Sequence, residues 1–330
     1  MEGKKRIALV AGGDSGEYVV SMESARMIRE NIDPGLYEVY PVVIRGGKWE
    51  YTDRAGNKYP VNRNDFSIQT EEEKITFDCA FITIHGTPGE DGKLQGYFDL
   101  LGLPYTTAGT LASALTFNKY WCKLVAGQLG YDIPSSVRLR MPVSFTKSEI
   151  INKLGLPLFV KPNEGGSSLG MSLVRDAESL LPAIGNAFEY CNEVLVEEYI
   201  EGNELTCGAF MHKGSVKALP VTEIISKTSA QYFDFEAKYT PGAADEITPA
   251  RIPEDLSQRV RDCSARLYGD LGLAGLVRFD YIYRDDVLYF LEVNITPGMT
   301  PTSIVPQQAE YEGISIRELF SMVLSEAIGR

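Results

Sequence analysis

Two apolar segments near the end of the chain, residues 276–283 and 287–293, carry polar side chains in a pattern typical of neighbouring β-strands. Arg278 and Asp280 lie two residues apart in the first segment, and Glu292 and Asn294 have the same spacing in the second. Residues two apart on a strand point to the same face of the sheet. Carboxylate and amide oxygens are ligands that magnesium takes, usually together with substrate phosphates. The pattern therefore predicts a hairpin with a site for magnesium and phosphate, the alternative being an ion-paired exposed face.

The turn between these two segments decides whether the polar groups share one face. A two-residue turn would leave Glu292 on the face opposite Asp280. A three-residue loop centred on Asp286 pairs Asp280 with Glu292 and Arg278 with Asn294. We expect the three-residue loop, because four polar groups divided between two faces would be hard to satisfy.

Charge and cysteine content restrict the possible partners and the compartment. The net charge of −13 argues against nucleic acid or an anionic membrane as a partner. No segment has the apolar length needed to span a membrane. The 5 cysteines are an odd number without a CxxC pair, which favours reduced thiols in the cytoplasm. With only 2 histidines and no cysteine pair beside them, a zinc site is not expected.

The order of predicted elements indicates mixed α/β and α+β architecture. Strands at 6–10, 37–44 and 77–84 and a helix at 16–31 predict an open parallel α/β domain over residues 1–115. A second unit, 116–200, begins within a long helix at 111–129. The third unit, 201–330, is rich in strands. Within it, residues 226–251 lack clean periodicity, and we expect them to form a functional loop or lid.

A glycine- and serine-rich segment, residues 163–170, follows Lys161 at the end of a predicted strand. Glycines let backbone N–H groups approach an anion, and the hydroxyl of Ser167 or Ser168 adds a donor. Lys161 supplies a positive charge suited to phosphate. The segment does not have the Walker pattern, and the alternative is a flexible hairpin turn.

Three further segments carry candidate ligand groups. Residues 12–17 join the first strand to a helix whose N-terminus could receive an anion, or they form a capped turn. His85 follows the buried strand 77–84 at its carboxyl end, where Glu90 could orient it, although a structural histidine is as good an interpretation. Residues 197–204 could read an adenine edge and ribose, or form an acidic connector. Lys238 and Tyr239 lie within the predicted lid.

The order of these motifs resembles the ATP-grasp superfamily and, over nearly the whole chain, the D-alanine–D-alanine ligase family. The matching segments are Gly12-Gly13-x-Ser15 with Ser21, His85-Gly-x-x-Gly-Glu-Asp-Gly92, Val160-Lys-Pro with Gly166-Ser-Ser-x-Gly170, Glu236-Ala-Lys-Tyr239, Arg278-x-Asp280, and Glu292-x-Asn294-x-x-Pro-Gly-Met-Thr300. The resemblance implies that the second and third units form a two-subdomain ATP-grasp fold.

The resemblance also implies which residues bind ATP and metal. ATP would be held by Lys119, Lys161, Ser168, Glu197, Glu198, Ile200 and Glu204. Two Mg²⁺ ions, for which Mn²⁺ is expected to substitute, would join its phosphates to Asp280, Glu292 and Asn294. The carboxylate of one D-alanine would attack the γ-phosphate, and the amine of a second would then displace phosphate from the acyl phosphate.

Further residues of this resemblance would serve the reaction itself. Lys238 and Arg278 would stabilise negative charge, with the Gly298 N–H as an oxyanion donor. His85 and Ser303 would contact the substrates, Ser303 through the carboxylate of the second. Ser167 and Tyr239 would close the site against water. Tyr239 also favours an amine as second substrate, because relatives that make D-alanyl-D-lactate usually lack this tyrosine.

One position departs from the family pattern. Val19 stands where the motif usually has a glutamate, which is expected to hold the ammonium of the first substrate and to bond the serine at position 167. Glu17 or a water would then substitute, or the first subsite differs.

The resemblance further implies a homodimer, formed through the N-terminal domain. The alternative functions are another ATP-grasp carboxylate–amine ligase, including a D-alanine–D-lactate ligase, and a non-catalytic ATP-binding protein. The missing G-x-G-x-x-G argues against a Rossmann oxidoreductase.

Overall fold

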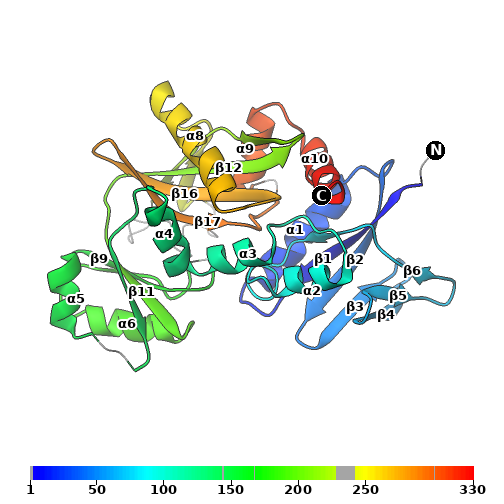
Figure 1. The fold of residues 1–330 in the computed structure, drawn as a ribbon, viewed down its shortest axis with the longest axis horizontal. Helices are drawn as coiled ribbons and strands as arrows, with labels where there is room; N and C mark the ends of the chain where they lie inside the picture. The colour runs from blue at the N-terminus through cyan, green and yellow to red at the C-terminus, as the bar shows by residue number, and fades with distance from the viewer. Residues whose placement is uncertain (1–2, 143–144, 167, 228–241, 301) are drawn as a thin grey trace.

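The computed structural model describes residues 3–142, 145–166, 168–227, 242–300 and 302–330. Within these residues the strands form three sheets that follow one another along the chain (Figure 1). The predicted site residues Ser167, Lys238 and Tyr239 lie outside the described residues, as does most of the predicted lid.

The elements have the following bounds. The first sheet contains β1 (Lys5–Gly12), β2 (Tyr37–Arg45), β3 (Lys48–Thr52), β4 (Lys58–Asn62), β5 (Ser67–Gln69), β6 (Lys74–Ile75) and β7 (Cys79–Ile82). The second contains β8 (Ser136–Arg140), β9 (Leu158–Pro162), β10 (Ser172–Val174) and β11 (Glu193–Glu198). The third contains β12 (Asn203–His212), β13 (Ser215–Ala218), β14 (Thr222–Ser226), β15 (Ala244–Ile247), β16 (Leu276–Arg284) and β17 (Val287–Asn294). The helices are α1 (Tyr18–Asn31), α2 (Lys93–Leu101), α3 (Thr110–Phe117), α4 (Lys119–Gln128), α5 (Lys147–Leu154), α6 (Leu180–Phe188), α8 (Glu254–Asp270), α9 (Ile304–Tyr311) and α10 (Ile316–Ile328).

The first sheet has the order β6-β5-β4-β3-β2-β1-β7, and its strands β2, β1 and β7 are parallel. This part confirms the predicted open α/β arrangement. Strands β3 to β6 extend the sheet in antiparallel fashion, which the sequence pattern did not indicate. Alternate residues of β1 point to opposite faces. Ile7 and Leu9 pack in the core that contains Phe320 of α10, whereas Val10 packs in the core that contains Phe98 of α2.

The second sheet is antiparallel, with the order β10-β9-β11-β8. One face is apolar: Val160 of β9 and Val196 of β11 form a core with residues of α5 and α6. Because neighbouring residues on a strand point to opposite faces, Lys161 and Glu197 project from the other face. The polar residues predicted on these strands are thereby directed away from the core.

The third sheet has the order β15-β14-β12-β16-β17, with β13 beside β12. Phe279 and Tyr281 of β16 are fully buried in a core shared with α8. Arg278 and Asp280, which alternate with them, point to the opposite face. The prediction of an irregular segment over 226–251 was wrong for its final part, because Ala244–Ile247 forms β15 and pairs with β14.

The predicted helix at 111–129 is interrupted at Asn118, where α3 ends and α4 begins. Asn118 has an extended backbone, with φ −88° and ψ 100°, and its side chain accepts a hydrogen bond from the Trp121 N–H. This is the N-cap role for which asparagine is favoured. The break places Lys119 at the first position of α4.

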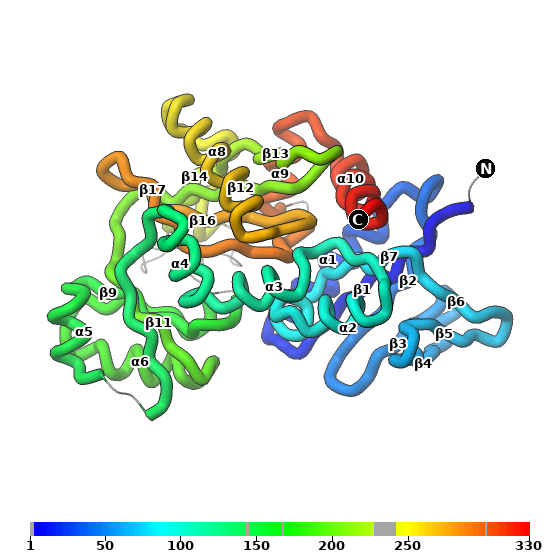
Figure 2. The backbone as a smooth tube through the Cα atoms, viewed as in Figure 1, coloured from blue at the N-terminus to red at the C-terminus, as the bar shows by residue number. Residues whose placement is uncertain are grey.

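The C-terminal helix packs on the N-terminal sheet. Helix α10 packs against α1 and β7 of the first sheet, so the red C-terminal segment in Figure 2 lies beside the blue first strand. The Phe320 and Phe81 rings meet edge to face, with centroids 5.8 Å apart. Among the described helices, none has both the length and the apolar character required to cross a membrane.

Candidate active site

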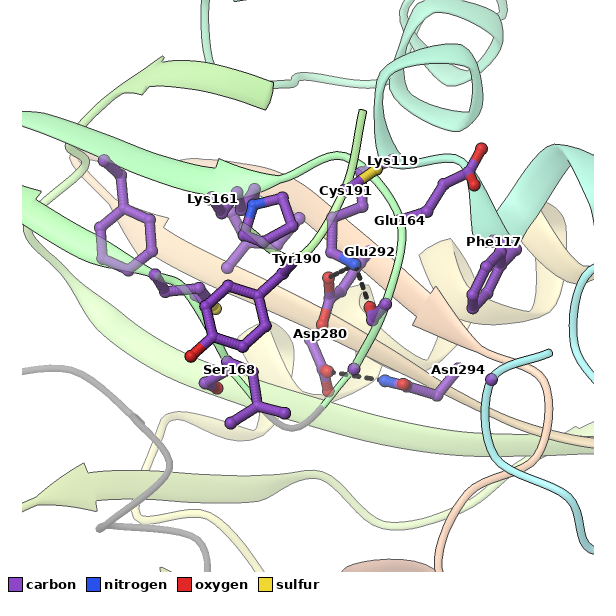
Figure 3. A pocket seen from close by; sticks show the side chains of 18 of the residues that line it. Phe117, Lys119, Lys161, Glu164, Ser168, Tyr190, Cys191, Asp280, Glu292 and Asn294 are labelled. Carbon is purple, nitrogen blue, oxygen red and sulfur yellow. Dashed lines mark hydrogen bonds and ion pairs between the residues drawn. The ribbon is translucent and has the colours of Figure 1, made fainter. Parts of the chain in front are cut away.

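A cleft of about 540 Å³ opens between the second and third sheets and reaches the first loops of the N-terminal sheet (Figure 3). Its walls carry all of the residues predicted to bind nucleotide and metal, and also Glu17, which was predicted to contact the first substrate. The nucleotide and metal residues are Lys119, Lys161, Ser168, Glu197, Glu198, Ile200, Glu204, Asp280, Glu292 and Asn294. The apolar side chains of Phe159, Met171, Ile282 and Leu291 also line the cleft. Charged walls with apolar patches suit a ligand that has both a flat apolar part and an anionic part.

The hairpin of β16 and β17 brings its four polar residues to one face, as predicted. Arg278 is opposite Asn294, and Asp280 is opposite Glu292. The predicted three-residue loop was wrong, however. Arg284 pairs with Val287, so the turn has two residues, and a β-bulge next to Asp280 restores the register.

The bulge explains how a short turn and a common face coexist. Asp280 is opposite Glu292 while Tyr281 is opposite Phe290, so Leu291 is the extra residue on β17. Bulges change the direction of side chains and are frequent near active sites. Asp285 and Asp286 have φ angles of 49° and 61°, the left-handed pair that a two-residue hairpin turn requires.

Asp280 is held from three directions. Arg278 donates to both carboxylate oxygens, from Nε at 2.8 Å and from Nη2 at 2.7 Å. Thr206 Oγ1 donates to Oδ1 at 2.6 Å, and Asn294 Nδ2 donates to Oδ2 at 3.1 Å. Burial opposes the charged form of Arg278, but the attraction of Asp280 outweighs it and raises the Arg278 pKa. Thr206 was not among the predicted site residues, because its place on a predicted strand was its only signal in the sequence.

Lys119, at the start of α4, contacts both the glycine-rich segment and strand β17. Its Nζ donates to the Gly165 carbonyl at 2.6 Å and lies 3.6 Å from Glu292 Oε2. The ammonium therefore stands between the glycine-rich segment and the carboxylate on β17, where the predicted phosphate would lie.

A buried trio of two lysines and one glutamate lies behind the cleft. The Glu197 carboxylate receives Lys161 Nζ at 2.6 Å on Oε2 and Lys123 Nζ on Oε1. All three residues are at least 95% buried. Burial raises the pKa of a carboxyl group, but the two lysines outweigh this and lower the Glu197 pKa. Lys123 was not among the predicted site residues.

Glu17 lines the cleft and lies against the glycine-rich segment. A Cβ atom added at Gly166 would come within 2.5 Å of Glu17 Oε2, so only glycine allows this close approach. Val19, in contrast, is 75% exposed and is not part of the cleft wall. Glu17, and not Val19, lies beside the glycine-rich segment.

His85 lies outside the lining of the cleft, in a small buried cavity beside Thr296. The predicted orientation of His85 by Glu90 was wrong, because the Glu90 carboxylate accepts a hydrogen bond from the Gly86 N–H instead, at 2.7 Å. His85 Nε2 has no hydrogen-bond partner within the described residues. Burial lowers the His85 pKa, and burial together with the Glu17 charge raises the Glu90 pKa to about 7.

Gly298 and Ser303 lie next to each other but are not part of the cleft wall. A Cβ atom at Gly298 would come within 2.9 Å of Ser303 Oγ. Ser303 precedes α9, and its hydroxyl accepts a hydrogen bond from the Thr300 N–H at 3.1 Å. Glu198 lines the cleft, and its side chain accepts a hydrogen bond from the Ser135 N–H at 2.6 Å.

The donor set on β16 and β17 is compatible with a hard divalent cation. It has two carboxylates and one amide, and the Asn294 side chain donates through Nδ2, which leaves its carbonyl oxygen as an acceptor. Within the described residues there is no cluster of three or more His, Cys, Asp or Glu side chains that could hold a metal. Such a small protein donor set suits magnesium when phosphates complete the coordination shell.

Family models match most of the chain. "D-ala D-ala ligase N-terminus" covers residues 6–108, and "D-ala D-ala ligase C-terminus" covers residues 136–325. A D-alanine–D-alanine ligase of Phocaeicola vulgatus is 46% identical over 322 residues, which are 97% of this chain and 98% of that protein.

Solved structures of related enzymes have the same fold. The VanG D-Ala:D-Ser ligase of Enterococcus faecalis is 32% identical with a TM-score of 0.87, covering 98% of this chain and 100% of that one. The D-alanine–D-alanine ligase of Bacillus anthracis complexed with ATP is 29% identical with a TM-score of 0.78, covering 98% of each chain.

The fold and the charged cleft between the second and third sheets place the chain in the ATP-grasp class of ligases. Within this class, it belongs to the D-alanine–D-alanine ligase family. This family is ATP-dependent and uses magnesium.

Proposed function

We propose that the chain joins two D-alanines into D-alanyl-D-alanine with conversion of ATP to ADP and phosphate, in the cytoplasm, for peptidoglycan precursors. The observation that carries the proposal is the pair of facing walls: Lys161 and Glu197 on the second sheet, and Asp280, Glu292 and Asn294 on the third. One wall suits a nucleotide and the other suits its metal-bound phosphates.

The nucleotide would lie between these walls. Lys119 and Lys161 would contact its phosphates, and the Ser168 hydroxyl would add a donor. The edge of the adenine would meet the backbone of residues 198–200, next to Glu197, and Glu204 would reach the ribose. The apolar side chains of Phe159 and Ile282 lie on the same cleft, where they would cover the flat base.

Two magnesium ions would be held by Asp280, Glu292 and Asn294, and manganese would substitute for them. Bound magnesium would neutralise and orient the phosphates of ATP. Arg278, fixed by two hydrogen bonds to Asp280, would stabilise charge on the phosphoryl group and on the tetrahedral intermediate, together with the Gly298 N–H.

The reaction would take place in two balanced steps. The carboxylate of the first D-alanine attacks the γ-phosphorus, which forms D-alanyl phosphate and releases ADP. The amine of the second D-alanine attacks the acyl carbon, phosphate leaves, and the amine gives up a proton. Activation replaces a poor oxide leaving group by phosphate, so positioning and charge neutralisation are the main requirements.

The substrates would be held where the cleft meets the first sheet and in the region beyond its wall, where His85 and Ser303 lie. Glu17 would receive the ammonium of the first D-alanine and His85 would contact this substrate, while Ser303 would receive the carboxylate of the second. Lys238, Tyr239 and Ser167, outside the described residues, would close the site against water. The proposed chain has three units, residues 1–115, 116–200 and 201–330, and the third contains the lid at 226–251. The proposed assembly is a homodimer.

Phosphate release from purified protein with ATP and magnesium tests this function. We expect release with D-alanine, none with L-alanine or without amino acid, and D-alanyl-D-alanine as the product in mass spectrometry. A second assay supplies D-serine together with D-alanine, because a D-Ala:D-Ser ligase is among the similar structures. No stimulation by D-alanine would contradict the proposal.

The metal assignment has its own variant. Glu292→Ala should lower turnover by about a hundredfold or more, because a metal ligand contributes several kcal/mol to the reaction. Glu310→Ala, an exposed position on α9, is the matched control and should retain the wild-type rate. A wild-type rate in Glu292→Ala would exclude this ligand.

A further inference from the structure

Three elements meet at the buried trio of Lys123, Glu197 and Lys161. Lys123 comes from α4, Glu197 from β11 and Lys161 from β9. Each carboxylate oxygen of Glu197 serves one ammonium. Glu197 and Lys161 line the cleft, whereas Lys123 does not. Lys123 therefore lies behind the wall and acts on a ligand through the residues that line the cleft.

The Lys123 ammonium influences the orientation of the Lys161 ammonium, because both bind the Glu197 carboxylate. A carboxylate that met only one lysine could offer both oxygens to it and draw it into the wall. With Lys123 on Oε1, Glu197 has only Oε2 for Lys161, at 2.6 Å. Lys161 keeps the rest of its donors for other partners.

With both lysines charged, the trio would carry an excess of positive charge. Two lysines share one carboxylate, and buried cations without full compensation are costly. Burial accordingly lowers the Lys123 pKa to about 7, against the attraction of Glu197, which favours its neutral form above that pH. The Lys161 pKa is raised, because Glu197 and Glu292 together outweigh its burial. An anionic ligand in the cleft would favour the charged form of Lys123.

We propose that Lys123 is a positioning residue for the nucleotide: it fixes the Glu197 carboxylate and thereby directs Lys161 toward the cleft. The inference rests on the proposed function only in that a nucleotide occupies this cleft. The charged groups that face Lys123 are Glu197 and Lys161, and Glu292 acts in turn on Lys161.

A variant that keeps the shape of the side chain but removes its charge tests the role. Lys123→Met should weaken ADP binding, measured by calorimetry, by about tenfold, the loss expected when a charged hydrogen-bond network loses one member. The KM for ATP should rise by a similar factor, while the KM for D-alanine changes less than twofold. Lys147→Met, at an exposed ion pair with Glu178 on the same unit, is the matched control and should bind ADP as the wild type does.

A double variant separates positioning from a merely structural role. If Lys123 acts through Glu197, Lys123→Met should add no further loss of ADP affinity in a Glu197→Gln background. Equal losses in both backgrounds, or a lower melting temperature with unchanged ADP affinity, would overturn the proposal. Because ADP binding needs no D-alanine, a protein that binds ADP but makes no dipeptide would contradict the proposed function alone.

A measurement on the unmodified protein tests the proposal without any substitution. At pH 8 the empty cleft should hold Lys123 mostly neutral, and the charge of the nucleotide should favour its protonation. Calorimetric enthalpies of ADP binding in the presence of magnesium should differ between buffers of high and low ionisation enthalpy, in the direction of proton uptake. Equal enthalpies would contradict the charge balance of the trio.

Discussion

Asp280 shows how neighbours adapt a single side chain to its place in the site. Asp280 is only 8% exposed, and its carboxylate accepts hydrogen bonds from Arg278, Thr206 and Asn294. A buried carboxylate needs such donors to remain charged. From the spacing, the sequence predicted that Asp280 shares one face of the hairpin with Arg278 and Asn294. Thr206 could not be found in this way, because it reaches Asp280 from a different strand.

Thr206→Val keeps the shape of the side chain and removes the hydroxyl that bonds Asp280. We expect the magnesium concentration for half-maximal activity to rise by about tenfold, because a buried charged group loses one of its donors. Thr222→Val, on the neighbouring strand β14 and equally buried, is the control and should lower stability without changing the magnesium requirement. The assignment fails if both variants need the same magnesium concentration as the wild type.

Glu90 gives a pH dependence at the scale of one residue. Its folded-state pKa, about 7, lies above the ordinary value of 4.5. The folded state therefore binds more protons than the unfolded state in this range, and stability should fall as pH rises from about 4.5 to 7. Glu90→Gln retains an oxygen for the Gly86 N–H and should flatten this slope. Urea unfolding at pH 5 and pH 8 measures it, and an unchanged slope in the variant would contradict the assignment.

At the scale of elements, the strands and helices were predicted well where periodicity was clear, and less well where local irregularity decided the outcome. The predicted pairing of Asp280 with Glu292 was confirmed, but the predicted turn was not its cause. The bulge at Leu291 compensates for the two-residue turn, and the sequence pattern did not indicate this bulge. The break at Asn118 was missed, since the apolar period of α3 and α4 continues through it. Lys123 was missed because a lysine on a helix is usually exposed.

The turn of this hairpin can be tested through Asp285. Its φ of 49° is strained for a β-branched residue, so Asp285→Val should destabilise the protein by about 1–2 kcal/mol. Asp285→Gly should be neutral or stabilising by about 1 kcal/mol or less, because glycine adopts this conformation freely. The exposed ion pair of Asp285 with Arg284 contributes little to either result. Thermal unfolding of both variants gives the comparison, and equal melting temperatures would exclude the left-handed turn.

At the scale of the whole molecule, the first and last segments of the chain share one core. Phe320 of α10 is fully buried and packs against Phe81 of the first sheet, while Met299 and Leu276 from the third unit join the same cluster. The sequence indicated an N-terminal domain ending near residue 115. It did not indicate that a helix more than 200 residues later would complete the core of that domain, because periodicity describes local structure and not partners distant in the chain.

Phe320→Ala should lower the free energy of unfolding by about 3–5 kcal/mol, since it leaves a cavity where a large aromatic side chain was buried. Arg317→Ala on the exposed side of the same helix is the control, with an expected change of about 0.5 kcal/mol or less. Urea unfolding followed by circular dichroism measures both. If Phe320→Ala matched the control, α10 would not be part of the N-terminal core.

The position of α10 also matters while the protein is being synthesised. A ribosome makes the strands of the first sheet early, whereas α10, which covers part of one of their faces, is made much later. Until α10 has been made, Leu9 and Phe81 lack the apolar contacts that this helix supplies. A growing chain therefore carries an uncovered apolar surface through most of its synthesis, which is the kind of surface that chaperones bind.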